Sequence, residues 1–390
     1  MRILHVIPAY YPATYWGGPI TSVYGLNNAL AALPDTEIRV LASDSAGPRL
    51  NQKILASALD GAALYPGQQV TFTRRIAGND FSPAMLRRLP AQIAWADIVH
   101  LTAVYSFPTL PVLLLCRLQN KPLVWSLRGA LQDAQSLPFA RKKMLKALWN
   151  RLCLALLQPQ KTVLHATSPL EKELSARGLP GIETAVIRNG VETPAQMPQR
   201  QFRPNGQLRL LFLSRLDRKK GLENLLEALT LLSDLPISLS VFGTGHKAYQ
   251  RSLLKLAESF GLSQETIRFY GHADGQAKRD AFFNADVFIL PSYSENYGMV
   301  IAEALAQGLP VIASTETPWP QLEEKGCGLW VENSPAALAQ AIRKMEKMNL
   351  AEMSPRGWQW MRDEFSWESI AGQMRRVYES LITPQGAGQK

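Results

Sequence analysis

The chain has 390 residues, 46% of them hydrophobic and 19% charged, which is typical of a globular protein and enough for two domains. Its three cysteines lie far apart without metal-ligand spacing, which predicts a reducing compartment and no zinc site. The opening apolar run stops at Pro8 and a later one is broken by prolines, so we expect neither a secretion signal nor a membrane-spanning helix.

The excess positive charge is confined to the first half of the chain. Residues 1–190 contain 20 Lys and Arg against 10 Asp and Glu, a net charge of +10, and residues 191–390 contain 22 of each. These counts add up to the chain totals of 42 and 32. The imbalance predicts that the first domain meets an anionic surface or ligand.

In chain order, the first half alternates between β-rich runs and helical patterns. Strands are expected at 2–10, 37–43, 97–103, 122–129, 161–168 and 183–189. A Gly/Pro loop, "PATYWGGP", and a helix at 21–33 follow the first strand, and further helices are expected at 111–120 and from 169 onward. This alternation predicts a parallel, doubly wound sheet.

The stretch 191–207, "VETPAQMPQRQFRPNGQ", interrupts the pattern, because it is rich in Pro and Gln and has no apolar period. We interpret it as a linker between domains. A second alternation follows, with strands expected at 208–216, 237–245, 267–273, 287–293 and 310–314, and helices between them. The predicted fold class is therefore α/β, with Rossmann-like domains at 1–190 and 208–369 that face each other across a ligand-binding cleft.

The most informative stretch is "SYSENYGMVIAEALAQG", a polar turn followed by a short helix that Gly308 should end. Free amides near Gly298, Met299 and Val300 would form an anion site at the start of this helix. Glu295 in the turn and Glu303 in the helix would then bind hydroxyl groups beside a phosphate. The alternative is that one glutamate stabilises the helix dipole and the other is a surface residue.

A second candidate element is "FLSRLDRKKGLENLLEAL". Arg215 and Lys220 follow the end of a strand, where two exposed cations would suit a diphosphate leaving group. The alternative is an ordinary solvated turn.

Taken together, "SRLDRKKGLENLLEAL", "RNGVE", "VFGTGHKAYQRSLLKLAESFGL", "IRFYGHA", "ADVFILPSYSENYGMVIAEALAQGLPVIAS" and "FSWESIAGQM" resemble glycosyltransferase family 4 in content and order. The resemblance covers nearly the whole chain. It implies the GT-B fold and sugar transfer from a nucleotide-sugar with retention at the anomeric carbon. It also implies that the first domain binds the acceptor, that the second binds the donor, and that a C-terminal helix at about 370–385 packs back on the first domain.

The resemblance also implies roles for individual residues. Arg215 and Lys220 would bind the donor diphosphate, Glu295 would face the transferred sugar, and Glu303 would bind the ribose hydroxyls. The remaining residues implied to bind the donor are Gly17 and Gly18 in the first loop, Arg128, Gly243, Asn296, Tyr297, Gly298, Met299 and Val300. Gly17 and Gly18 lack a Cβ, which would let the loop approach the phosphates.

One position departs from the family pattern. Many members carry a histidine after the strand that corresponds to "PLVWSL", where this chain has Arg128. The change leaves the donor sugar open, and Arg128 could instead have a structural role in a salt bridge. The chain has no Asp-x-Asp sequence, so we expect no metal and no cofactor beyond the nucleotide-sugar itself.

The segment 140–161 reads as a basic amphipathic helix, with Lys142, Lys143 and Lys146 largely off its apolar face. One hypothesis is that it docks on an anionic membrane beside a glycan or lipid-linked acceptor, which would place the enzyme in the cytoplasm, peripheral to the inner face of the cell membrane. The alternative is a core-facing helix with a solvated basic side. We expect no nucleic-acid partner. Two other classes remain open, a non-catalytic nucleotide-sugar-binding scaffold and an oxidoreductase with two Rossmann-like domains.

Overall fold

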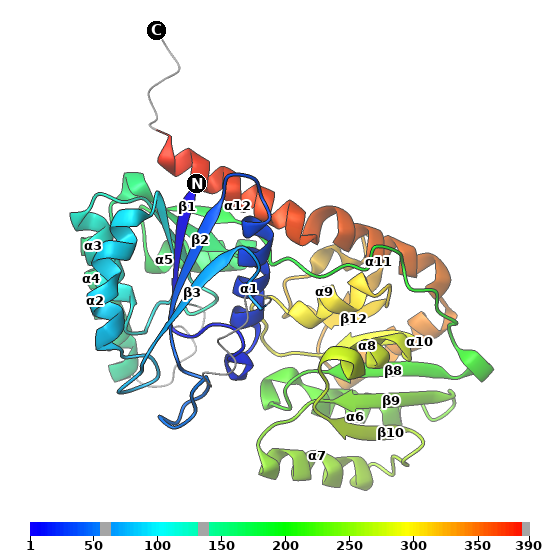
Figure 1. The fold of residues 1–390 in the computed structure, drawn as a ribbon. Coiled ribbons are helices and arrows are strands. Elements are labelled where there is room, and N and C mark those ends of the chain that lie inside the picture. The colour runs from blue at the N-terminus through cyan, green and yellow to red at the C-terminus, as the bar shows by residue number, and fades with distance from the viewer. Residues whose placement is uncertain (55–63, 132–139, 384–390) are drawn as a thin grey trace. The chain divides into compact units, whose positions relative to one another are not determined.

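The computed structural model describes residues 1–54, 64–131 and 140–383, with only the backbone described for 140–143 (Figure 1). It divides into two units: unit 1 is Met1–Gly190 with Trp367–Lys390, and unit 2 is Val191–Ser366. Each unit contains one parallel sheet with helices packed on it, which confirms the prediction of two Rossmann-like domains.

Within the described residues, unit 1 has a seven-stranded sheet in the order β3-β2-β1-β4-β5-β6-β7. Its strands are β1 (Arg2–Ile7), β2 (Glu37–Ser43), β3 (Gln68–Thr73), β4 (Ile98–Thr102), β5 (Leu123–Ser126), β6 (Thr162–Ala166) and β7 (Glu183–Val186). Its helices are α1 (Gly18–Ala31), α2 (Pro83–Trp95), α3 (Thr109–Leu118), α4 (Ala140–Leu156), α5 (Pro169–Gly178) and α12 (Trp367–Ile382). One apolar core joins the sheet to α2, α3 and α4, and another joins it to α1 and α12, so both faces are covered.

Unit 2 has a six-stranded sheet in its described residues, in the order β10-β9-β8-β11-β12-β13. The strands are β8 (Leu208–Leu213), β9 (Ile237–Phe242), β10 (Ile267–Gly271), β11 (Val287–Leu290), β12 (Val311–Ser314) and β13 (Gly328–Val331). The helices are α6 (Leu222–Thr230), α7 (Lys247–Ser259), α8 (Gly275–Phe283), α9 (Met299–Ala306), α10 (Pro335–Lys347) and α11 (Leu350–Phe365). A single apolar core runs through the unit.

Three helices begin with the same Ser–Pro signal. Ser82, Ser168 and Ser334 each precede a proline, and each serine hydroxyl accepts a backbone N–H from the third residue after it, at 3.2–3.3 Å. Proline fits the first helical position because the N–H that it lacks would have no partner there, and serine satisfies one of the other free donors. The sequence therefore sets the starts of α2, α5 and α10 locally.

The stretch predicted as a linker, 191–207, is packed along unit 2. The guanidinium of Arg200 donates to the carbonyls of Phe282, Ala285 and Gln307 at 2.7–3.1 Å, and the Arg203 amide donates to an Asp286 carboxylate oxygen at 3.0 Å. Its role as a linker between domains stays a prediction.

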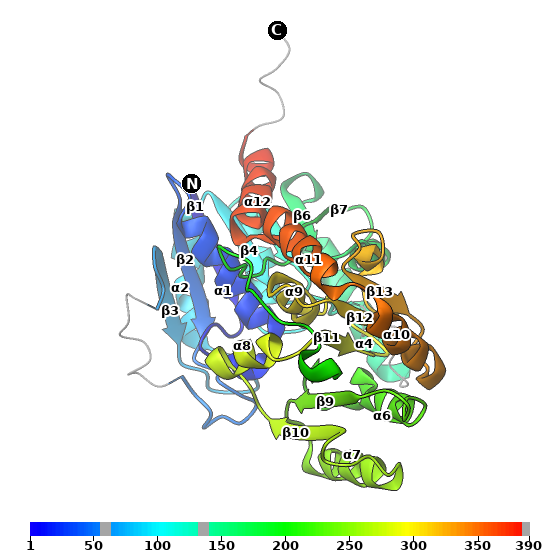
Figure 2. The same ribbon diagram turned by 90° about the vertical axis from the view of Figure 1, so that its right-hand side faces the viewer.

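Helix α12 belongs to unit 1 and packs against α1, and both ribbon views place the two helices side by side (Figures 1 and 2). At its start, the Trp367 indole lies against Gly25 of α1 and against Gly190. A Cβ at either glycine would come within 2.2–2.3 Å of the ring. Real Cβ atoms do not approach that closely, so both positions need glycine for Trp367 to stay where it is.

A buried chain of hydrogen bonds fixes the other end of α12 to the sheet. The His165 Nε2–H donates to the Ile187 carbonyl at 2.9 Å, because a carbonyl can only accept. His165 Nδ1 must then accept a hydrogen bond from the Ser126 hydroxyl at 2.6 Å. The Ser126 oxygen in turn accepts one from His100 Nε2–H, also at 2.6 Å. The Tyr378 hydroxyl completes the chain by donating to His100 Nδ1 at 2.5 Å. All donors and acceptors along this line are satisfied when both imidazoles are neutral.

The protonation state agrees with that hydrogen-bond order. Burial lowers the pKa of His5 and of His165 to about 3, and the charge of Arg128 acts in the same direction. Burial also lowers the pKa of His100 well below 6.5, and the neighbouring histidines add to the effect. His5 stacks on His100 with 4.3 Å between ring centroids, so a positive charge on either ring would repel one on the other.

We therefore predict that acid destabilises unit 1 before its carboxylates protonate. Above pH 6.5 these histidines are neutral in both the folded and unfolded states. Below it the unfolded chain binds protons that the folded chain does not bind, so stability falls as the pH drops toward 3. At pH 5.5 the loss should be about 1.4 kcal/mol for each of His5 and His165. Denaturant unfolding of the full chain at pH 7.5 and 5.5 measures this.

His165→Gln tests the assignment, because it should reduce the dependence of unfolding free energy on pH. The exposed His272 of unit 2 is the matched control, and His272→Gln should leave the dependence unchanged. Equal stability of the wild-type protein at the two pH values would contradict a neutral buried histidine chain.

Candidate active site

The predicted site residues of unit 2 lie where its central strands end. Arg215 and Lys220 follow β8, Gly243 follows β9, and Glu295 follows β11. These strands are consecutive in the sheet and parallel, so their carboxyl ends share one edge. The structure therefore brings these four residues to the same edge.

The turn after β8 presents its two predicted cations differently. The Asp217 side chain accepts the Lys219 amide at 3.0 Å and starts a short 3-10 helix, Arg218–Lys220. Arg215 is exposed, as expected, but the Lys220 side chain is only 13% exposed. The expectation that both cations are exposed is thus right for Arg215 and wrong for Lys220. The reason is that the Lys220 ammonium forms an ion pair with the Glu295 carboxylate, which is itself 16% exposed.

Further bonds hold the loop after β11 to the turn after β8. The Tyr293 amide donates to the Lys219 carbonyl at 2.7 Å, and the Ser292 hydroxyl donates to Glu295 Oε2 at 3.4 Å. Glu295 therefore has a fixed position beside a cation at the strand ends. Such a carboxylate can accept hydrogen bonds from sugar hydroxyls, and the ammonium beside it can attract a phosphate oxygen.

Two glycines allow these loops to approach so closely. Gly221 has a φ of +62°, and a Cβ there would lie 2.0 Å from the Pro291 carbonyl oxygen. Gly243 has a φ of +142°, and a Cβ there would lie 1.8 Å from the Ser214 carbonyl oxygen. Sequence reasoning expected Gly243 to help form the nucleotide pocket. The structure shows that it also packs the end of β9 against the turn after β8.

The residues from Asn296 to Val300 form the entry to α9. Gly298 has a φ of +75° and is the N-cap, and the Trp319 indole N–H donates to the Tyr297 carbonyl at 2.5 Å. The first amides of a helix have no partner within it, so Met299 and Val300 present free donors. Asn296 Oδ1 is buried and has no hydrogen-bond partner among the described residues, which leaves an acceptor for a ligand.

Glu303 lies in the middle of α9, where the sequence predicted it. Its carboxylate pairs with the Lys278 ammonium of α8 at 2.7 Å, and each side chain is 28% exposed. Ile301, Ala304 and Leu305 form the buried face of the helix, and Gly308 follows its end, as expected. Glu303 is therefore partly exposed and ion-paired, and its role in binding ribose hydroxyls stays a prediction.

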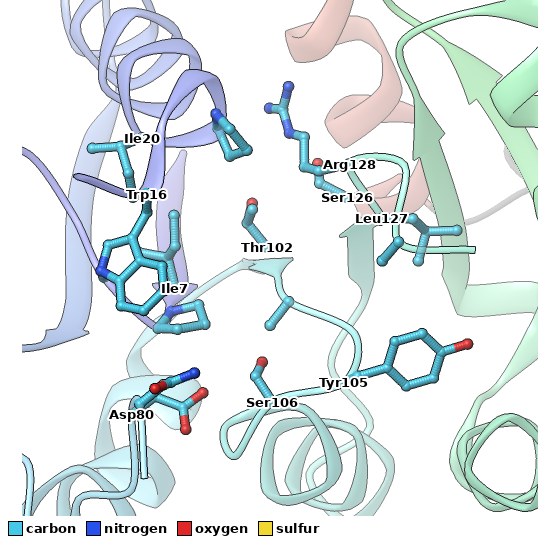
Figure 3. A pocket seen from close by; sticks show the side chains of 16 residues that line it. Ile7, Trp16, Ile20, Asp80, Thr102, Tyr105, Ser106, Ser126, Leu127 and Arg128 are labelled. Atoms are coloured by element: carbon cyan, nitrogen blue, oxygen red, sulfur yellow. The ribbon is translucent and has the colours of Figure 1, made fainter. Parts of the chain in front are cut away.

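The three remaining predicted residues lie in unit 1. Gly17 is the N-cap of α1 with a φ of +80° and open space where a Cβ would lie, and Gly18 is the exposed first residue of that helix. Arg128 follows β5 with a φ of +51°, and its Nη1 donates to the Asn189 side chain. Arg128 also lines a pocket of unit 1 (Figure 3).

Sequence reasoning missed several polar residues of unit 1. It assigned no role to the histidines, whereas His5, His100 and His165 meet in the sheet. A signal was available, since each follows at least two apolar residues in an expected strand. No comparable signal marked Trp16 and Asp80, which line the pocket beside Arg128. In the ranges that the structure describes, no three His, Cys, Asp or Glu residues are grouped as metal ligands, and the absence of a metal requirement stays a prediction.

Two family models match consecutive parts of the chain. "Glycosyltransferase Family 4" matches residues 16–194, and "Glycosyl transferases group 1" matches residues 195–357. The chain belongs to the family 4 glycosyltransferases and has the GT-B fold, which confirms the resemblance. It is an enzyme that transfers a sugar from a nucleotide-sugar.

Individual relatives are distant. A phosphatidyl-myo-inositol mannosyltransferase of Mycobacterium leprae is 27% identical over 98% of each chain. WcaL of Escherichia coli K12, assigned to colanic acid biosynthesis, is 26% identical, but the match spans only 53% of this chain and 54% of WcaL. Among solved structures, HepE of Anabaena superposes with a TM-score of 0.72 at 17% identity, covering 97% of this chain and all of HepE. WaaG has a TM-score of 0.67 at 17% identity, covering 96% and 99%.

We predict that Gly221→Ala disrupts the unit 2 site. A left-handed φ costs a residue with a Cβ about 1–2 kcal/mol, and the clash with Pro291 adds to that, so the unfolding free energy should fall by more than about 2 kcal/mol. Gly261→Ala is the matched control, because Gly261 has a φ of +68° with nothing within 4 Å of a Cβ. Denaturant unfolding compares the two variants, and equal losses would mean that the close approach to Pro291 is unimportant.

Proposed function

We propose that this glycosyltransferase transfers a sugar with retention to a lipid-linked or growing polysaccharide acceptor, and that it does so at an anionic membrane surface. The observation that supports a nucleotide-sugar donor site is the ion pair of Lys220 and Glu295 at the ends of β8 and β11. The observation that supports binding to a membrane surface is a row of exposed apolar side chains on α4.

At the donor site, charge builds up on the diphosphate as the glycosidic bond breaks. Lys220 and Arg215 would stabilise that charge, and Glu295 would accept hydroxyls of the transferred sugar. Glu303 would bind the ribose hydroxyls, which requires its carboxylate to be shared between them and Lys278. Arg128, Gly17 and Gly18 would contribute from unit 1. HepE has been crystallised with UDP and with UDP-glucose, which supports a nucleotide diphosphate donor of this kind.

On α4, apolar side chains face away from the core. Met144, Leu145, Leu148 and Leu152 are 48–67% exposed and follow helical spacing. The inner side of the helix is formed instead by Trp149, whose indole N–H donates to the Val104 carbonyl at 3.0 Å, and by Cys153. The four exposed residues thus lie on one side of α4, and the contacts with the core lie on another.

One side of α4 faces the core, as the alternative expected, and the exposed row favours docking of its other side on an apolar phase. Leaving four large apolar side chains in water on one helix is unfavourable, and an interfacial helix would bury them among acyl chains. Lys146 lies with its ammonium 4.5 Å from the centre of the Tyr105 ring, and the side chains of Lys142 and Lys143 lie outside the described residues. None of the described helices has the length and apolar character to cross a bilayer, so attachment would be peripheral, at the cytoplasmic face.

Relatives support this acceptor class. WaaG is named for lipopolysaccharide biosynthesis, WcaL is assigned to colanic acid, and the mycobacterial mannosyltransferase is named for a phospholipid. The acceptor of this chain, its donor sugar and its site of action are proposals.

We predict that Lys220→Ala and Arg215→Ala each lower the turnover of the nucleotide-sugar by about two orders of magnitude, the usual effect of losing one strong contact to developing charge. Nucleotide release measures this. Lys219→Ala removes an exposed cation from the same turn and is the control, with turnover expected near that of the wild type. Lys220→Ala leaves the Glu295 carboxylate without its ammonium partner, which could destabilise the fold. The double variant Lys220→Ala with Glu295→Gln removes that unpaired charge, so its unfolding free energy separates lost catalysis from lost folding. Near-wild-type turnover in both single variants would refute the diphosphate site.

For the membrane, we predict two kinds of loss in vesicle sedimentation. Neutralising Lys142, Lys143 and Lys146 should weaken binding to anionic vesicles about a hundredfold at low salt, since each contributes about 1 kcal/mol, and the effect should shrink as salt rises. Replacing Leu145, Leu148 and Leu152 with serine should weaken binding at both low and high salt, because burial of apolar surface is not screened.

Leu231 and Leu254 of unit 2 are also exposed, and their replacement with serine controls for general loss of surface apolarity. Turnover on a soluble acceptor should be unchanged in all these variants. If the wild-type protein ignores anionic vesicles at low salt, the membrane half of the proposal is wrong.

A further inference from the structure

A pocket of about 400 Å³ lies wholly within unit 1, where β1, β4 and β5 end (Figure 3). Its walls come from the loops after these strands, from the start of α1 and from the segment between β3 and α2, which carries Asp80. From β1 the chain proceeds outward to β2 and β3 in one direction, and β4 to β7 lie in the other, so β1 and β4 flank the point where the strand order reverses. Ligands of open α/β sheets bind at this point.

Most of the lining is apolar, formed by Ile7, Pro8, Ala9, Pro19, Ile20 and Leu127. Two polar groups are buried in that lining without a hydrogen-bond partner in the described ranges, the indole Nε1–H of Trp16 and the hydroxyl of Ser106. Buried polar groups without partners are costly, so a pair that lines one pocket points to a polar ligand.

Asp80 adds a carboxylate to the same end of the pocket. Its side chain lies near Trp16 and Ser106 in Figure 3, whereas the Arg128 guanidinium points away from them. Asp80 is only 8% exposed, and its Oδ2 accepts the Phe107 amide at 3.1 Å. Within the described residues Oδ1 makes no hydrogen bond. Burial raises the pKa of this carboxyl, although the Phe107 amide and Arg75 oppose that effect.

These features define the chemistry of the occupant. An acceptor oxygen at Asp80 requires hydroxyl donors, the Trp16 N–H requires an oxygen acceptor, and Ser106 can serve as either. Apolar walls suit the C–H faces of a sugar ring. A carboxylate or phosphate on the ligand would be repelled by Asp80, and the Arg128 guanidinium in the lining, which could pair with it, points away from that end.

We propose that this pocket binds the terminal sugar of the acceptor and that this sugar is uncharged, with Asp80, Trp16 and Ser106 holding its hydroxyl groups. The inference rests on the proposed function, because it gives the acceptor half of that reaction a site and a substrate class. Any phosphate of a lipid-linked acceptor would then lie outside the Asp80 end of the pocket.

The test uses the full chain without donor and a panel of methyl hexopyranosides, with the matching methyl hexuronosides and hexoside 6-phosphates as charged probes. Binding is measured by saturation-transfer NMR. At least one neutral glycoside should bind, and its charged counterparts should bind at least tenfold more weakly. Asp80→Asn should weaken the neutral glycoside about tenfold or more, as expected for a lost hydrogen bond to a charged group, and should reduce the discrimination against the uronoside.

Trp16→Phe keeps the ring and removes only the N–H, and Ser106→Ala removes only the hydroxyl. Each should weaken the neutral glycoside severalfold, which keeps the proposal testable if Asp80→Asn fails to fold. Asp35→Asn, at an exposed left-handed turn position that asparagine tolerates, removes the same charge elsewhere in unit 1 and should change nothing.

Three results would overturn the proposal. They are no binding by any neutral glycoside, equal binding by charged and neutral probes, and competition between the glycoside and a nucleotide-sugar, which would assign the pocket to the donor. Nucleotide release from the donor is measured separately. If no nucleotide is released, the proposed transferase reaction is wrong. The glycoside-binding result would still stand as a separate finding.

Discussion

Burial of both faces of each sheet restricts where this chain can place polar side chains. Strands whose two sides are covered by helices have room mainly for apolar residues, so groups that bind ligands must lie at the strand ends. In unit 2 Arg215, Lys220, Glu295 and the glycines that let their loops meet obey this rule. Unit 1 breaks it with three histidines inside the sheet. That is possible because the chain of hydrogen bonds from Tyr378 to the Ile187 carbonyl gives each ring nitrogen of His100 and His165 a partner. Asn27 and Thr102 give partners to the two ring nitrogens of His5.

Glu295 and Glu303 share one electrostatic arrangement. Each is held by a lysine from another element, Glu295 by Lys220 and Glu303 by Lys278. A half-buried carboxylate alone would be costly, and its lysine partner offsets that cost and holds it in position. Such a pair can be shared with an arriving ligand, because phosphate competes for the ammonium while hydroxyls bind the carboxylate. The lysines thus contribute both to the positions of the glutamates and to the binding of charge.

Much of the architecture was predictable because apolar periodicity and Ser–Pro or glycine signals are local. Most strands, the helix at 299–308 and its glycine end follow from such patterns, as does the clustering of Arg215, Lys220 and Glu295 once parallel strands are assumed. By contrast, β3 was missed because its residues are largely polar, and α2 because Pro90 and two arginines obscure its period. The Lys220–Glu295 pair, the outward row of α4 and the pocket around Asp80 depend on contacts between distant segments, which no local pattern encodes.

Because α12 belongs to unit 1, that unit is discontinuous along the chain, and the order of synthesis matters. Residues 191–366 intervene between Gly190 and Trp367, and they form a contiguous unit that can fold once it leaves the ribosome. At 5–20 residues per second this interval lasts roughly 10–35 s. Throughout it the sheet face that carries His100 lacks Tyr378, and the groove between Gly25 and Gly190 lacks its indole. A nascent unit 1 therefore exposes a mostly apolar, histidine-bearing face until the last helix is made, and a message truncated near residue 366 would leave that face permanently open.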